Sequence, residues 1–377
     1  MIVAYVGIAL GSVIGVFALY LLIVAVMPGF SVPAQPLRDG ERSDVNRQAR
    51  LAVPKKEISF QSKGTVLHAW LYLPEPRSHP VPCIVMAHGL GGTKDAGLES
   101  YAVRFRDAGC AVLAFDYRHF GSSGGAPRQL VWIPYQLEDY AAAVDYARGL
   151  AEVDAERIAL WGTSLSGGHV IVTAAKDPRI ACAVAQCPWL DGRAAAIEAM
   201  KQGGIGQLFR LVPHAQRDIV RSFLGLSPHV IPLVGRPGSV AVMPVAEAWD
   251  ALQELAPPDF VNQACARILI RMDKYRPVVH AGRVRCPVML QICDEDVRDP
   301  EHFVRDTAQR LGKLAEIIHY PIAHFDIYLG EDFERSVRDQ VAFFEKHLRP
   351  ADAASTQSDR HQPGRATPIT NPGGSHA

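Results

Sequence analysis

The strongest constraint on the fold is an alternation of short apolar runs with amphipathic stretches between Lys55 and Arg349. Such alternation is typical of a mostly parallel sheet that is covered by helices. The first run differs, because "EISFQSKGTVLHAWLYLP" indicates a hairpin that turns at Lys63 and Gly64. The sequence therefore predicts an α/β fold over residues 55–349, with a mostly parallel central sheet and helices on both faces.

Further apolar runs are expected as strands: "VPCIVMAHG", "CAVLAFDYR", "RIALWG", "IACAVAQCPWL", "CPVMLQICDED" and "AEIIHYPIAHF". Helices are expected over residues 97–108, 135–149 and 332–348, and another begins at "SGGHVIVTAAK". Between Trp189 and Arg285 roughly 95 residues separate two strands that a crossover of about 20 would join. We expect an inserted helical cap there, at about residues 190–285, lying over the carboxyl ends of the strands, where open α/β sheets bind ligands.

The N-terminal segment differs from the rest of the chain. Ile2 to Met27 contains no charged residue and would span about 39 Å as a helix, enough to cross a bilayer. A secretory signal would carry a basic residue before its apolar run, and none precedes this one. We expect a transmembrane anchor over residues 1–28, a juxtamembrane linker over 29–54, and a disordered polar tail over 350–377.

The anchor carries two further expectations. Gly7, Gly11 and Gly15 recur at four-residue spacing, which would let a second helix approach closely in a homodimer, although small residues are also common in membrane helices. Basic side chains follow the anchor and none precedes it, so the positive-inside rule places the catalytic domain in the cytoplasm. The seven cysteines form no C-x-x-C pair and mostly lie in apolar runs, as expected for reduced thiols in a reducing compartment.

The stretch "IALWGTSLSGGHV" holds two serines, and either could be a nucleophile. A catalytic serine of this kind sits on a sharp turn from a strand to a helix, which exposes its oxygen. The strand is expected to end at Gly162, which places Ser164 at the apex of the turn and Ser166 in the first helical turn. We therefore favour Ser164, with Ser166 as the alternative; a serine at a helix start can also be a simple N-cap.

A serine attacks a carbonyl at neutral pH only when a histidine takes its proton and a carboxylate orients that histidine. His324 follows the last predicted strand, in "AHFDIY", and "DEDVRDP" follows the preceding one. Asp296 has the favoured position in that loop; Asp294 and Asp299 are the alternatives. His319, within a strand, and His169, on the helix after Ser164, are expected to be structural.

The pieces "HGLGGTKD", "FDYRHFGSSGG", "WGTSLSGGHV", "CDEDVRDP" and "HFDIY" together resemble α/β-hydrolases of the serine esterase and serine aminopeptidase-like group, over about residues 55–349. The chain order Ser, Asp, His is the order used in that fold. The loop "HGLGG" stands where the oxyanion loop belongs, so we expect the Leu90 amide, with that of Leu165, to form the oxyanion hole, and His88 to shape the loop. Ser166 departs from the usual glycine.

These residues predict a membrane-anchored serine hydrolase that cleaves carboxylic esters or thioesters through Ser164, Asp296, His324 and an acyl-enzyme. The apolar cap segment Val230–Val245 suits an acyl or alkyl group. A serine aminopeptidase is the second hypothesis, and it would need a cap carboxylate to bind the substrate's amine. The candidates are Glu198, Asp218, Glu247, Asp250, Glu254 and Asp259. The third hypothesis is a catalytically inactive binding protein with the same fold. Such a protein would lack a member of the Ser-Asp-His triad, and none is missing from this sequence.

Other function classes are disfavoured by the sequence. Basic and acidic residues both number 39, and no basic tract is present, so a nucleic-acid partner is not expected. The glycine-rich stretch "GLGGTK" has Lys94 where a dinucleotide fingerprint needs its third glycine. Neither H-E-x-x-H nor a Cys/His cluster occurs, so we expect neither a cofactor nor a metal.

Overall fold

The structure, a computed structural model, describes residues 2–27, 31–33, 53–76, 79–296 and 301–349. Its centre is an eight-stranded sheet in the order β1-β2-β4-β3-β5-β6-β9-β10. The strands are β1 (Lys56–Ser62), β2 (Thr65–Tyr72), β3 (Val81–Ala87), β4 (Ala111–Phe115), β5 (Val153–Thr163), β6 (Ile180–Gln186), β9 (Val288–Cys293) and β10 (Ala315–Tyr320). Pairing is antiparallel for β1 with β2 and for β2 with β4, and parallel from β4 to β10. The predicted mostly parallel sheet is confirmed.

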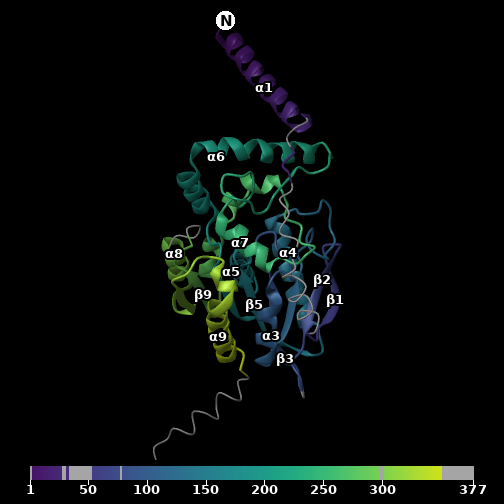
Figure 1. The fold of residues 1–377 in the computed structure, drawn as a ribbon, viewed down its shortest axis with the longest axis vertical. Coiled ribbons are helices and arrows are strands. Elements are labelled where there is room, and N and C mark those ends of the chain that lie inside the picture. The colour runs from purple at the N-terminus through teal and green to yellow at the C-terminus, as the bar shows by residue number, and fades with distance from the viewer. Residues whose placement is uncertain (1, 28–30, 34–52, 77–78, 297–300, 350–377) are drawn as a thin grey trace, which may run out of the picture.

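Helices cover both faces of this sheet (Figure 1). One face packs against α4 (Ile133–Arg148), α5 (Leu165–Lys176) and α8 (Glu301–Leu311), and the other against α3 (Leu98–Asp107) and α9 (Gly330–His347). Strand β3 shows why two cores form: Cys83 and Val85 enter the first and Ile84 and Met86 the second. Successive strand side chains point to opposite faces, so a fully apolar strand supplies both cores.

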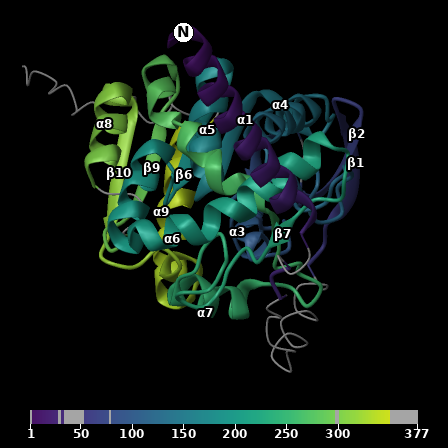
Figure 2. The ribbon, with the colours of Figure 1, turned by 90° about the horizontal axis from the view of Figure 1, so that it is seen from above.

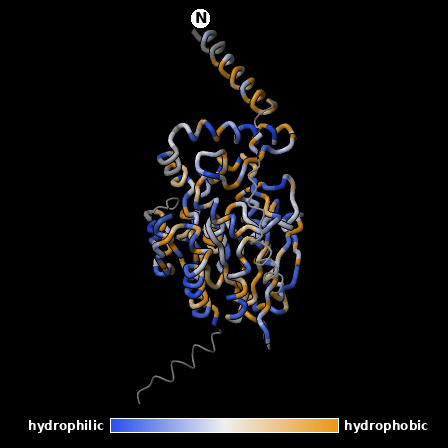
Figure 3. Tube along the Cα trace, in the orientation of Figure 1, coloured by the Kyte–Doolittle hydropathy of each residue, from blue (hydrophilic) through white to orange (hydrophobic). Residues whose placement is uncertain are grey.

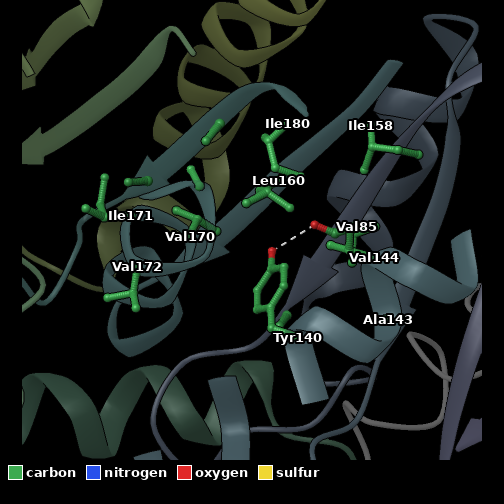
Figure 4. Packing of buried hydrophobic residues seen from close by; sticks show 14 of the residues in the cluster. Val85, Tyr140, Ala143, Val144, Ile158, Leu160, Val170, Ile171, Val172 and Ile180 are labelled. Carbon is green, nitrogen blue, oxygen red and sulfur yellow. Dashed lines mark hydrogen bonds between the residues drawn. The ribbon is translucent and has the colours of Figure 1, made fainter. Parts of the chain in front are cut away.

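The first core contains one buried tyrosine that ties a helix to two strands (Figure 4). Tyr140 of α4 is fully buried, and its hydroxyl lies 2.9 Å from the Val85 carbonyl oxygen and 2.8 Å from that of Trp161. A buried hydroxyl without a partner would cost free energy, so these contacts fix the position of α4 across β3 and β5.

An insertion follows β6 and ends before β9. It contains α6 (Gly192–Phe223), β7 (Val230–Ile231), α7 (Ala246–Leu255), β8 (Ala264–Cys265), η1 (Ala266–Ile270), η2 (Met272–Lys274) and η3 (Pro277–Arg283). Helix α6 is two helices joined at a kink, because Gly204 has the non-helical angles φ 65° and ψ 178°. Asp218 of α6 accepts hydrogen bonds from both the Nε and a terminal nitrogen of Arg267, at 2.6 and 3.0 Å, which fastens the cap helix to η1.

The C-terminal end of helix α1 (Ile2–Val26) contacts α6, and the rest of α1 extends away from the body of the molecule (Figures 1 and 2). Figure 3 shows that it is mainly hydrophobic. Its side chains are described at Tyr5 and from Leu10 onward. Among the described residues, no helix combines the length and the apolar character that crossing a membrane requires. The anchor is therefore not supported by the structure. The predicted linker, 29–54, lies mostly outside the described residues, and the predicted tail, 350–377, wholly so.

One local expectation needs correction, and one helix was not predicted. Strand β5 ends at Thr163, one residue later than predicted, because Gly162 and Thr163 still pair with Ala185 and Gln186 of β6. Ser164 therefore follows the strand directly. The pattern also gave no indication of α8, whose amphipathic sequence follows the loop after β9.

Candidate active site

Ser164 stands between the end of β5 and the start of α5. Its backbone angles are φ 54° and ψ −119°, which side-chain-bearing residues adopt rarely and at a cost of order 1–3 kcal/mol. The turn is tight: a Cβ on Gly162 would lie 2.2 Å from the Ser166 carbonyl oxygen, so only glycine fits there. A strained serine on a sharp strand-to-helix turn is the geometry of a nucleophile elbow.

The other serine of the motif has a different environment. Ser166 is fully buried, and its hydroxyl lies 2.7 Å from the Tyr117 hydroxyl and donates to the His88 carbonyl oxygen. Ser164 is partly exposed. Ser164 is therefore the more accessible of the two serines, whereas Ser166 ties α5 to the loop that begins at His88.

His324 and Asp296 are brought together by the loops after β10 and β9. The Nδ1 of His324 is hydrogen-bonded to Oδ2 of Asp296, and both side chains are buried. Asp294 instead lies with Oδ1 2.6 Å from Nδ1 of His319, with both side chains about half exposed. Asp299 lies outside the described residues. Among these carboxylates, the described geometry favours Asp296 as the group that orients His324.

The opposite ring nitrogen of His324 faces the strand ends beside the elbow. Its Nε2 lies 3.9 Å from Sγ of Cys187, the residue after β6. The preceding residue, Gln186, accepts the Ser164 amide at 2.9 Å. Cys187 thus lies against the histidine and one residue from the backbone that holds the elbow. No sequence signal singled it out, because it reads as one more apolar strand residue.

The loop "HGLGG" lies beside Ser164, as predicted from its place in the chain. A Cβ on Gly89 would lie 3.0 Å from Cβ of Ser164, so this loop approaches the elbow closely. Among the described residues, neither the Leu90 nor the Leu165 amide donates to a backbone carbonyl. Both amides thus have a hydrogen available for an oxyanion. His88 is buried and Nδ1 lies 2.9 Å from the Gly89 carbonyl oxygen; burial lowers the pKa of His88, which favours the neutral ring.

A buried ion pair supports this loop, and sequence analysis missed it. Nζ of Lys94 lies 2.7 Å from Oδ2 of Asp116, the residue after β4, and the Lys94 amide donates to Oδ1 at 2.7 Å. The Ser122 amide donates to Oδ2 at 3.0 Å. Both pieces, "HGLGGTKD" and "FDYRHFGSSGG", stand out in the sequence, but which of their side chains meet depends on the tertiary structure.

The apolar cap segment Val230–Val245 contacts this loop and the residue that follows His324. Leu233 lies so near Gly91 that a Cβ there would be 2.7 Å from its methyl carbons. Its cluster also contains Leu90 and Phe325, the neighbours of Gly91 and His324. The Phe325 amide donates to a carboxylate oxygen of Glu247 on α7 at 3.2 Å. The cap therefore contacts both sides of the site. Among the described side chains, no cluster could hold a metal ion.

Known proteins resemble this chain over the same region. The X-Pro dipeptidyl-peptidase (S15) family matches residues 63–207. The quorum-quenching protein AidA of Acinetobacter baumannii is 40% identical over 292 residues, which are 77% of this chain and 94% of AidA. The thiohydrolase aneE of Aspergillus aculeatus is 28% identical over 308 residues, covering 78% of this chain and 93% of that protein.

A solved structure shows the same architecture. The crystal structure of the α/β hydrolase GrgF from Penicillium sp. sh18 matches with a TM-score of 0.67 and 24% identity, covering 78% of this chain and 99% of GrgF. This likeness concerns the fold, whereas the relationship to AidA extends over most of both sequences. The chain belongs to the α/β-hydrolase superfamily and is a serine hydrolase of carboxylesterase-like type.

Proposed function

We propose that the protein hydrolyses carboxylic esters or thioesters through an acyl-enzyme on Ser164. In this mechanism His324 Nε2 takes the proton of the Ser164 hydroxyl as Oγ attacks the substrate carbonyl, while Asp296 holds the other ring nitrogen. The Leu90 and Leu165 amides receive the oxyanion. His324 then returns the proton to the leaving alcohol or thiol, and water repeats the sequence to release the acid.

The observations that carry this proposal are the strained elbow at Ser164 and the hydrogen bond between His324 and Asp296. The free side of the His324 ring contacts Cys187, whose neighbour Gln186 accepts the Ser164 amide. Ser164→Ala should abolish ester hydrolysis and labelling by a fluorophosphonate probe, a loss of order 10⁴-fold or more if the three groups act as a unit. Ser166→Ala is the matched control and should keep most of the activity. The reverse result would mean that the nucleophile is Ser166.

The substrate class is proposed from the cap. An apolar segment above the oxyanion loop suits an acyl chain and excludes water. The relationship to a thiohydrolase supports thioesters, and that to a quorum-quenching protein adds small signalling molecules to the compounds to be tested. A panel of esters and thioesters of increasing acyl length should give the highest kcat/KM for chains longer than acetyl.

A peptidase is the second candidate, favoured by the match of residues 63–207 to the X-Pro dipeptidyl-peptidase family. That match ends before most of the cap and before His324. Of the cap carboxylates proposed to bind an amine, Asp218 is buried against Arg267, and Glu247 accepts the Phe325 amide. X-Pro dipeptide anilides should therefore be cleaved more slowly than esters; the opposite order would select the peptidase.

We also propose that the apolar N-terminal segment holds the enzyme at a membrane surface, with the hydrolase domain in the cytoplasm. The absence of charge from Ile2 to Met27 and the basic residues that follow support this orientation. Protease added to intact cells should leave a C-terminal tag uncut. Gly11 and Gly15 have open space where a Cβ would lie, so a second helix could approach them, and dimerisation is tested by cross-linking in the membrane.

A further inference from the structure

The outer face of α6 carries large apolar side chains in water-accessible positions. The exposed fractions are 75% for Phe209 and 84% for Phe223, and 54% for Leu224 and 42% for Leu226 just beyond the helix. Phe209, Gln216 and Phe223 are spaced by seven residues, so they share one side of the helix. Large exposed apolar patches on a soluble domain mark a surface that binds a partner or a membrane.

Helix α1 leaves the molecule on this same side (Figure 2). The hydroxyl of Tyr20 donates to Oε1 of Gln216 at 2.9 Å, midway between the two phenylalanines along α6. Beyond this contact, α1 is itself exposed and apolar, with Val13 and Phe17 more than half exposed. The apolar surface of α6 is therefore continuous with that of α1.

The charges on α6 indicate which kind of partner binds this apolar surface. Its exposed or part-exposed charged side chains among the described residues are all basic: Arg193, Lys201, Arg210, Arg217 and Arg221. Asp218, the acid described on this helix, is buried against Arg267. Helices with one apolar and one basic face lie in the interface of anionic membranes. A second copy of the same face would bring basic side chains against each other, which disfavours a symmetric dimer through α6.

We propose that this cap face, formed by Phe209, Phe223, Leu224, Leu226 and the exposed Arg193, Lys201 and Arg210 of α6, lies on an anionic lipid surface. The inference deepens the proposed membrane location and rests on it. The cap, which contacts the loop beside Ser164 and the residue after His324, then faces the bilayer, with the α6 apolar side chains at the level of the headgroups. Acyl substrates that partition into lipid would meet the cap first.

The test uses the full chain with a polarity-sensitive dye on Phe223→Cys. All seven native cysteines are buried, so the introduced thiol is labelled selectively. Ile317→Cys, on the edge strand β10 and also exposed, is the matched control. With phosphatidylcholine–phosphatidylglycerol vesicles, the dye at position 223 should shift to the blue and become several-fold less accessible to iodide, and the dye at position 317 should not.

The outcomes separate the cap face from the anchor. Protein that floats with vesicles but leaves both dyes equally accessible to iodide overturns the docking face while leaving the anchor intact. Protein that does not float overturns both. Protection at position 223 without lipid would show a second copy instead. The role proposed for the basic side chains would be rejected by either of two results. One is equal protection of the dye at position 223 from iodide on neutral and anionic vesicles. The other is unchanged protection on anionic vesicles when Lys201→Gln and Arg210→Gln are combined. Hydrolysis of a soluble ester by the labelled protein reports separately on the catalytic proposal.

Discussion

Asp294 and Asp296 are two residues apart but have different environments. Asp296 is buried against His324, whereas Asp294 shares a half-exposed contact with His319. On the proposed mechanism, Asp296→Asn places an amide where the histidine needs an acceptor and mis-sets its tautomer, so kcat should fall by about 10⁴-fold with the fold intact. Asp294→Asn should change kcat little. Steady-state kinetics with circular dichroism checks both, and equal activity of wild type and Asp296→Asn would refute the assignment.

The buried His169 should make the free energy of unfolding depend on pH. It is fully buried, with Nδ1 2.6 Å from the Tyr275 hydroxyl and Nε2 3.0 Å from Oε1 of Gln136. Burial, with a smaller contribution from His88, lowers its pKa to about 3. The folded protein therefore binds this proton more weakly than the unfolded chain, so its contribution to stability is complete above about pH 6.5 and is lost as the pH falls toward 3.

At pH 5 this loss should be about 2 kcal/mol from His169 alone. Urea unfolding at pH 7 and pH 5 measures it, and His169→Gln should flatten the difference. His229, whose pKa burial lowers to about 4, acts in the same direction, so some dependence should persist in the variant. A protein whose unfolding free energy is unchanged between these pH values would contradict the prediction.

At the scale of elements, the Lys94–Asp116 pair joins the oxyanion loop to the end of β4. Both side chains are almost fully buried, so Lys94→Ala leaves an uncompensated charge and should cost about 3–5 kcal/mol. Lys56→Ala is the control: its 3.2 Å pair with Glu152 is exposed, and its loss should cost below about 1 kcal/mol. Chemical denaturation compares the two, and similar costs would show that the buried pair does not stabilise the loop.

The cap segment should determine acyl-chain preference. Met243 is partly buried and packs in the cluster that contains Leu90 and Phe325. Met243→Glu should lower kcat/KM for long acyl esters about 10-fold more than for acetyl esters, since a carboxylate in this apolar cluster opposes burial of the chain. Val279→Glu, at an exposed position on η3, is the control. A reduction that is uniform across chain lengths would count against the segment as an acyl pocket.

Local patterns predicted the elements whose form depends on local sequence. The β1–β2 hairpin turns where Lys63 and Gly64 have positive φ, and α7 coincides with the pattern "AEAWDALQEL". The extent of the cap helix α6 was harder to predict. Its glycines around position 204 and its Pro213 indicate that the helix ends, whereas the structure has helix on both sides of a single kink at Gly204. Packing against α1 and η1, distant in sequence, stabilises that helix.

The candidate site divides in the same way. The positions of Ser164, Asp296 and His324 relative to strand ends could be predicted, because strand ends are visible as the limits of apolar runs. The contacts of Cys187 with His324, of Glu247 with Phe325 and of Asp116 with Lys94 could not be predicted from the sequence. Each depends on which loops meet across the sheet, and their residue types are equally common in cores, helices and turns.

At the scale of the whole molecule, α1 is joined to the cap through its own backbone. Arg217 donates to the carbonyl oxygens of Val24 and Met27, at 2.5 and 3.0 Å, and Arg221 to that of Ala25 at 3.0 Å. These are the carbonyls that a helix leaves unpaired at its C-terminal end, where its dipole is negative. Two guanidinium groups therefore fix the angle between α1 and the cap helix α6.

Because of these contacts, a change in the angle of α1 would be transmitted to the cap helix α6. On the proposed membrane location, a lipid surface that changes the angle of α1 would move α6 through the two arginines. Turnover of a soluble ester in nanodiscs should then vary with lipid chain length, and replacing both Arg217 and Arg221 with Leu should remove that variation. Rates that vary with lipid chain length equally in both proteins would show that the two helices are not coupled.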